Sequence, residues 1–82
     1  MNYNVDKVDE AVLALLYLTS SKDQYATRAW KGLDLEILKR LHQKGYISDP
    51  GVKSITVEFS EEGARLSKEL FQKLFGCEDG KE

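Results

Sequence analysis

The chain has 82 residues with a net charge of −2, from 12 basic and 14 acidic side chains, and 41% of its residues are hydrophobic. A chain of this length supports one hydrophobic core, which excludes two independent domains. Its longest apolar run, AVLALLYL, is far shorter than the roughly 20 residues of a membrane-spanning helix and lacks the flanks of a signal peptide, so we expect a cytoplasmic protein. The slightly acidic balance also disfavours a strongly basic nucleic-acid binder.

A first helix is predicted after Asn4, a favourable N-cap, to about Thr19. One broad apolar arc of this helix should face the core, made of Val8, Ala11, Val12, Leu15, Leu16 and Leu18. Leu13 and Tyr17 fall on the opposite side, near Asp9. We therefore expect this pair to need a second covering surface.

The stretch YATRAWKGLD predicts a short second helix, which either Asp23 or Thr27 would cap. Either start places Trp30 next to alanines, and the burial tendency of tryptophan favours a core position for it. Gly32 ends this helix, because glycine adopts a left-handed backbone conformation without strain.

A third helix is predicted over about 35–44, with Asp34 as its N-cap and Gly45 just beyond its end. Its apolar stripe consists of Ile37, Leu38 and Leu41, and its outward residues are Glu36, Lys39, Arg40 and Gln43. Since only a short glycine-containing turn separates it from the second helix, the pair predicts a helix-turn-helix.

The rest of the chain predicts a hairpin and a last helix. The turn SDPG joins YIS to SITVEF, whose alternation is typical of a half-buried strand with Ile55 on the buried face. Ser60 then caps a helix that ends near Phe75. We expect an α+β winged helix-turn-helix domain over residues 1–76, with a two-stranded β-wing, followed by a polar tail over 77–82.

The sequence offers little for catalysis. Its one histidine, His42, lies on the third predicted helix, and its one cysteine, Cys77, lies in the polar tail. These two residues cannot assemble a His-dependent triad or a Cys/His metal cluster within one chain. No glycine-rich phosphate loop is present. We therefore expect no enzyme activity, no metal and no cofactor.

Two resemblances extend this interpretation. The segment LEILKRLHQKGYISDPGVKSITVEFSEEGARLSKELF resembles the recognition helix, wing and following helix of the MarR and PadR regulator families. The stretches VDEAVLALLYLTS, RAWKG and LHQKGYISDP together are similar to a small prokaryotic family of uncharacterised domains, over nearly the whole chain. The first resemblance implies a winged-helix fold and a role in transcription regulation on double-stranded DNA. The second implies no activity.

If the chain binds DNA, its third helix should enter the major groove. The predicted contacts are Lys39, Arg40 and Gln43 on this helix, and Arg28, Lys31 and Lys53 on phosphates beside it. Against this, Asp34 and Glu36 place carboxylates at the entering end of the helix. The same charges suit an ordinary solvated face in which Glu36 pairs with Arg40. The alternative function is a protein–protein interaction domain that binds no nucleic acid.

The first and last predicted helices carry more apolar surface than one small core needs. Terminal helices carry the dimer in MarR-like and PadR-like proteins, so the resemblance implies a homodimer through Leu13, Tyr17, Phe71 and Phe75. The alternative is that Phe71 and Phe75 pack over Leu13 and Tyr17 within a single chain.

Overall fold

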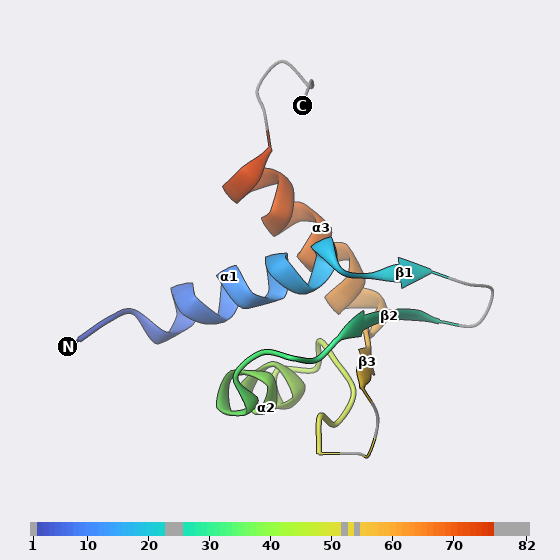
Figure 1. Cartoon of the computed structure of the whole chain (residues 1–82). Helices are drawn as coiled ribbons and strands as arrows, with labels where there is room; N and C mark the ends of the chain where they lie inside the picture. The colour runs from blue at the N-terminus through green and yellow to red at the C-terminus, as the bar shows by residue number, and fades with distance from the viewer. Residues whose placement is uncertain (1, 23–25, 52, 54, 77–82) are drawn as a thin grey trace.

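The computed structural model describes residues 2–22, 26–51, 53 and 55–76. In chain order its elements are α1 (Val5–Leu18), β1 (Ser21–Lys22), β2 (Thr27–Trp30), α2 (Leu35–Gln43), β3 (Thr56–Glu58) and α3 (Glu61–Phe75). Figure 1 shows α3 crossing α1, α2 alongside α1, and the strands beyond the end of α1. This arrangement confirms the α+β class and is consistent with a winged-helix layout. The predicted tail, residues 77–82, lies outside the described residues.

The helix α1 begins as predicted, with the Asn4 side chain capping it. Its buried face differs from the predicted arc, since Leu15 and Leu18 are exposed whereas Asp9 and Leu13 are buried. The physical reason is that both α2 and α3 pack against α1. The buried face therefore turns toward two neighbours instead of one.

The predicted second helix is wrong, because residues 27–30 form the strand β2. This strand pairs antiparallel with β1 on one side and with β3 on the other. In this register Ala29 lies opposite Val57, and each is 1% exposed. The centre of the sheet therefore joins the core, and β2 occupies the place in the chain that the predicted helix would have taken.

Trp30 lies at the surface, contrary to the predicted core position. It is 54% exposed, and its ring covers Gly32, where an added Cβ would overlap the indole. Neighbouring residues of a strand point to opposite faces, and Ala29 takes the buried one. The tryptophan therefore packs on the backbone of the following glycine and not between helices.

Among the described residues, the predicted hairpin between YIS and SITVEF is reduced to one bridge. Ile47 pairs with Phe59 across this bridge, and the principal partner of β3 is β2. Val57 is buried as expected, whereas Ile55 precedes the strand and is 76% exposed. The wing strand is therefore shorter than the alternating pattern indicates.

The helices α2 and α3 begin and end close to their predicted positions. Asp34 and Ser60 cap them with their side chains, and Gly45 follows α2 with a φ of 85°. Leu38 and Leu41 on the inner face of α2 are each 1% exposed. They complete the core together with α1 and the centre of the sheet.

Candidate functional site

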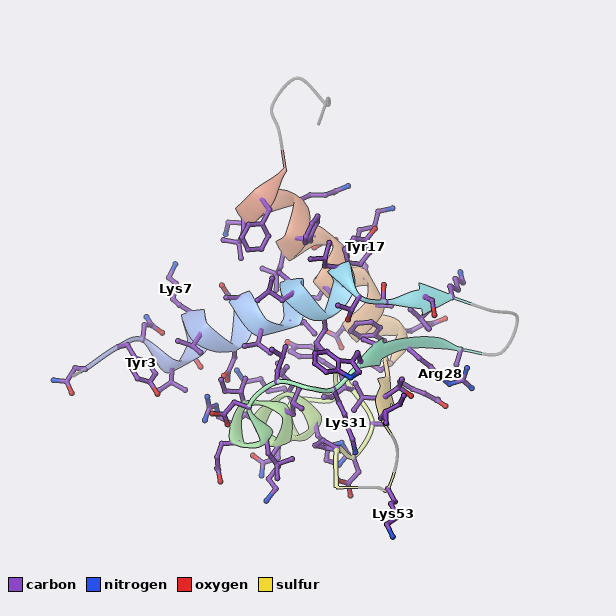
Figure 2. All side chains as sticks on the ribbon, in the orientation of Figure 1. Tyr3, Lys7, Tyr17, Arg28, Lys31 and Lys53 are labelled. Atoms are coloured by element: carbon purple, nitrogen blue, oxygen red, sulfur yellow. The ribbon has the colours of Figure 1, made fainter. Side chains whose placement is uncertain are left out.

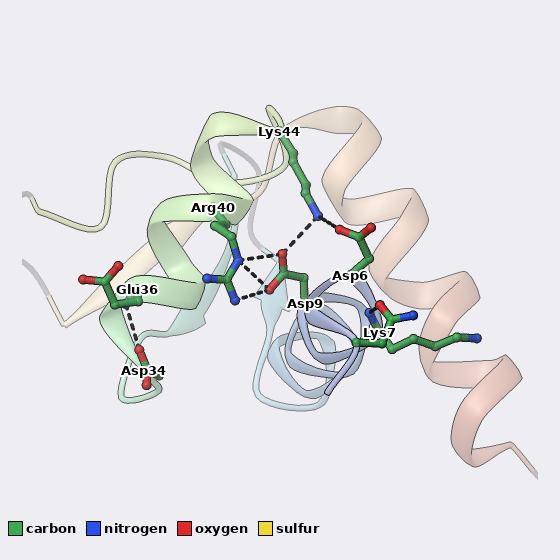
Figure 3. A network of polar contacts seen from close by, with 8 residues as sticks. Asp6, Lys7, Asp9, Asp34, Glu36, Arg40 and Lys44 are labelled. Carbon is green, nitrogen blue, oxygen red and sulfur yellow. Dashed lines mark hydrogen bonds and ion pairs between the residues drawn. The ribbon is translucent and has the colours of Figure 1, made fainter. Parts of the chain in front are cut away.

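Three of the six predicted DNA contacts lie on α2. Lys39 and Gln43 are exposed there. Arg40 does not face outward as predicted. Its Nε donates to both carboxylate oxygens of Asp9 at 3.0 Å, and its Nη2 donates to Asp9 Oδ1 at 2.7 Å (Figure 3). The side chain is therefore held against α1, because a carboxylate there pairs with it.

Asp9 is the centre of this polar network. It is 1% exposed, and it also accepts a hydrogen bond from the Lys44 ammonium, whose Nζ lies 3.0 Å from Asp9 Oδ2. Lys44 Nζ is 3.5 Å from Asp6 Oδ1 as well. Arg40 of α2 and Lys44 at its C-cap thus converge on one buried carboxylate of α1, as Figure 3 shows.

The network shifts the pKa of Asp9, Arg40 and Lys44. The hydrogen bond from Arg40 holds the pKa of the Asp9 carboxyl below its usual value of 3.8, although burial opposes this effect. The hydrogen bond to Asp9 raises the pKa of Lys44 above its usual 10.5, again against burial. All these groups are therefore charged at neutral pH. Sequence reasoning missed the network because Asp9 and Arg40 are 31 positions apart.

The other three predicted DNA contacts lie on and beside the sheet. Arg28 Nε is 3.7 Å from Glu58 Oε2, and Lys31 Nζ donates to the Pro50 carbonyl at 2.7 Å. Lys53 is exposed and points away from the helices in Figure 2. The six residues are therefore spread over α2, β2, the residue that follows β2 and the connection into β3. Contact with nucleic acid stays a prediction for them.

The predicted dimer residues separate into two groups. Leu13 is 1% exposed and belongs to the core, so it is not part of any surface. Tyr17, Phe71 and Phe75 form an aromatic row, with ring centroids 5.3 Å apart for Tyr17 and Phe71 and 5.4 Å apart for Phe71 and Phe75. The contact between Tyr17 and Phe71 matches the alternative of packing within one chain. The dimer itself stays a prediction.

The residues considered for catalysis do not come together. His42 is exposed, and its Nδ1 lies 2.9 Å from the Ile47 carbonyl oxygen. Cys77 lies outside the described residues. In the part of the chain that the structure describes, no three His, Cys, Asp or Glu side chains are grouped so as to hold a metal ion.

Residues 4–77 match the family described as Domain of unknown function (DUF6429). The chain belongs to this family. It is also similar to the "Uncharacterized protein y4hR" of Sinorhizobium fredii (strain NBRC 101917 / NGR234), with 47% identity over 75 residues, which cover 92% of this chain and 97% of that protein. The expected likeness to uncharacterised domains is thereby confirmed. No solved structure matches the chain.

Among the described residues, none of the helices combines the length and the apolar character that crossing a membrane requires.

Proposed function

We propose that the protein is a protein-interaction module of winged-helix shape, which pairs with a second copy of itself through the end of α3. The observation that carries this proposal is the exposure of Leu74 and Phe75, which are 45% and 50% exposed. Together with the half-buried Phe71 they make up a surface that we call the α3 tip. Large apolar side chains gathered at one helix end gain free energy when another surface covers them.

The geometry of the α3 tip supports a second copy as the covering surface. Residues 72–75 are all exposed, and Figure 1 shows this end of α3 extending past α1. Pairing about a two-fold axis brings the same patch together from both chains, so each α3 tip covers its equivalent. The contact between the Phe71 and Phe75 rings also presents a preformed aromatic surface to the partner.

Sedimentation equilibrium at protein concentrations up to about 1 mM tests this proposal, a range chosen because a small interface gives weak association. We expect the wild type to reach the dimer mass and Phe75→Ser to remain a monomer. Ile55→Ser is the matched control, since it also removes an exposed apolar side chain but lies next to β3. It should associate as the wild type does.

Three results would count against the pairing. These are a monomer mass for the wild type at the highest concentration, dimerisation of Phe75→Ser equal to that of the wild type, and an equal loss in Ile55→Ser. Circular dichroism of each variant shows whether the fold is intact. Phe75 is half exposed, so its replacement should leave the helix content unchanged.

DNA binding is the second candidate function. The observation that favours it is the exposure of Lys39 and Gln43 on one helix, α2, with Lys53 exposed beyond the sheet. Arg40 and Lys44 contribute less than their charge indicates, because both already neutralise Asp9. A duplex would therefore meet fewer available cations than the sequence suggests.

A further inference from the structure

A pocket of about 560 Å³ opens between the end of α1, the strands β1 and β2, and α3. Figure 1 shows these elements meeting where α1 ends. Three half-buried aromatic rings line the pocket, from Tyr17, Phe59 and Phe71. Ser67, which is fully buried, lies among the lining residues and donates its hydroxyl proton to the Ala64 carbonyl at 2.9 Å. The volume falls in the range of small-molecule sites, which are mostly apolar with a few polar groups.

Among the described residues, the charged side chains that line this pocket all have the same sign. Lys22 from β1 and Lys68 from α3 line it, and no carboxylate does so among the described residues. Within that part of the chain neither lysine has an ion pair, and the nearby Glu69 is bound to Arg65 at 2.9 Å. Two cations beside a hollow with aromatic walls attract an anion, because the walls of a cleft focus their field.

A second pocket provides the contrast. It has a volume of about 350 Å³ and lies between α1, α2 and α3, where its charged lining consists of Asp6, Asp9, Glu10 and Lys44. The lysine there is neutralised by Asp9 and Asp6. Only the larger pocket therefore combines aromatic walls with cations that the described residues leave without a counter-ion.

We propose that this pocket binds a small organic anion with an aromatic body, such as an aryl carboxylate. The ring system lies among the side chains of Tyr17, Phe59 and Phe71, and the carboxylate is held by the ammonium groups of Lys22 and Lys68. Offset or edge-on ring contacts favour an aromatic body, and the two lysines favour a negative charge at one end. The pocket shares Phe71 with the α3 tip. The inference nevertheless does not depend on the pairing of two copies, because every residue that lines the pocket belongs to one chain and neither Leu74 nor Phe75 is among them.

Titration with 2-naphthoate, followed by two-dimensional ¹H–¹⁵N NMR of the full chain, tests the proposal. We expect saturable shifts at the amides of Thr27, Ser67 and Phe71, which line the pocket. The neutral analogue 2-naphthamide has the same ring system without the charge. It should bind about tenfold more weakly, which corresponds to about 1.4 kcal/mol.

Two double variants of equal net charge test whether the anion binds at Lys22 and Lys68. Lys22→Gln with Lys68→Gln should weaken 2-naphthoate binding by about tenfold, which is again about 1.4 kcal/mol. Lys7→Gln with Lys73→Gln removes two exposed lysines that do not line the pocket and should leave the affinity unchanged. All four side chains are exposed, and the NMR spectrum itself reports whether each variant is folded.

Each of four results would overturn the proposal. The first is the absence of saturable shifts up to about 10 mM 2-naphthoate, a concentration beyond any specific affinity of interest. The second is equal affinity for 2-naphthamide, which would remove the role of the charge. The third is an equal loss of affinity in both double variants, which would indicate general electrostatic attraction. The fourth is a set of shifts centred on the pocket that contains Asp9.

Discussion

The buried carboxylate of Asp9 and the two cations that bind it differ in their access to water. The Asp9 side chain is 1% exposed, whereas the side chains of Arg40 and Lys44 are 33% and 37% exposed. A cation that loses this partner can be hydrated in place, but a carboxylate at this depth cannot. Removing the carboxylate of Asp9 is therefore not equivalent to removing the cation of Arg40.

We expect Arg40→Met to destabilise the fold more than Asp9→Asn. The first change leaves a buried carboxylate with Lys44 alone, while the second removes the buried charge and should lower the free energy of unfolding by about 1–2 kcal/mol. Urea unfolding followed by circular dichroism measures both. The double variant Asp9→Leu with Arg40→Met should be more stable than Arg40→Met alone, because no buried charge is left unpaired. Equal destabilisation by the two single changes would contradict the unequal burial.

The lowered pKa of Asp9 makes stability depend on pH in the acid range. The folded-state pKa lies below the usual value of 3.8, so the folded chain binds fewer protons than the unfolded chain. The contribution of Asp9 is therefore fully present above about pH 5 and is lost as the pH falls through the folded-state pKa. We expect the urea midpoint of the wild type to fall more steeply from about pH 5 to about pH 2 than that of Asp9→Asn. Parallel curves for the two proteins would refute this assignment.

At the scale of elements, the start of α3 packs directly against the segment that follows α2. A Cβ added at Gly63 would overlap the backbone carbonyl of Tyr46, so the two backbones are in direct contact. Ser60 Oγ donates to the Gly45 carbonyl at 2.6 Å and also accepts from the Gly63 N–H at 2.9 Å. One turn of helix therefore sets the direction of all of α3, including its exposed end.

Replacing Gly63 by alanine should destabilise the fold, although alanine favours a helix by about 1 kcal/mol. The added methyl group has to displace backbone and not a movable side chain, so we expect a net loss of about 1–3 kcal/mol. Thermal unfolding measures this change. Gly51→Ala is the control, because the nearest atom to its Cβ is Asp49 Oδ1 at 3.2 Å, which can move away. A rise in Tm for Gly63→Ala would show that the close approach is relaxed in solution.

The strand β2, where a helix was predicted, shows that a short local pattern does not distinguish a strand from a helix. Residues 27–30 alternate in burial as a strand should, with Ala29 buried and Trp30 exposed. The stretch is too short for this alternation to be distinguished from one turn of a helix. Its strand conformation depends on pairing with β3, which lies nearly 30 positions later in the chain. The caps at Asn4 and Ser60, in contrast, act within four residues and were predicted correctly.

At the scale of the whole molecule, features that depend on neighbouring residues are predicted from the sequence, whereas features that depend on packing between distant elements are not. The α+β class and the three helices follow from local periodicity and capping. The burial of Leu13 and the inward turn of Arg40 depend on how α1 packs against α2 and α3, which no local pattern contains. The sequence therefore gives its weakest support to the predicted DNA contacts. A charged side chain such as Arg40 is expected to face solvent, because its buried partner, Asp9, lies 31 positions away in the chain.

Among the described residues, at least four of the 12 basic side chains form ion pairs within the molecule. Arg40 and Lys44 neutralise Asp9, Arg28 lies near Glu58, and Arg65 pairs with Glu69. The net charge is −2. A protein that binds a duplex electrostatically releases counter-ions in proportion to the phosphates it contacts. Of the six predicted DNA contacts, Arg28 and Arg40 already lie beside carboxylates, so binding to nonspecific DNA should be weak and only mildly dependent on salt.

Fluorescence anisotropy of a labelled random-sequence duplex, titrated at about 50 mM and about 200 mM salt, tests this expectation. We expect no saturation at about 50 mM salt with protein up to about 100 μM. A dissociation constant of about 100 μM for nonspecific DNA already requires several phosphate contacts. Saturable binding that falls about a thousandfold between the two salt concentrations would instead require at least about six contacts. In that case Lys39→Gln should weaken binding and Lys7→Gln should not, since Lys39 lies on α2 and Lys7 on α1. Such a result would establish α2 as a DNA surface, with or without pairing at the α3 tip.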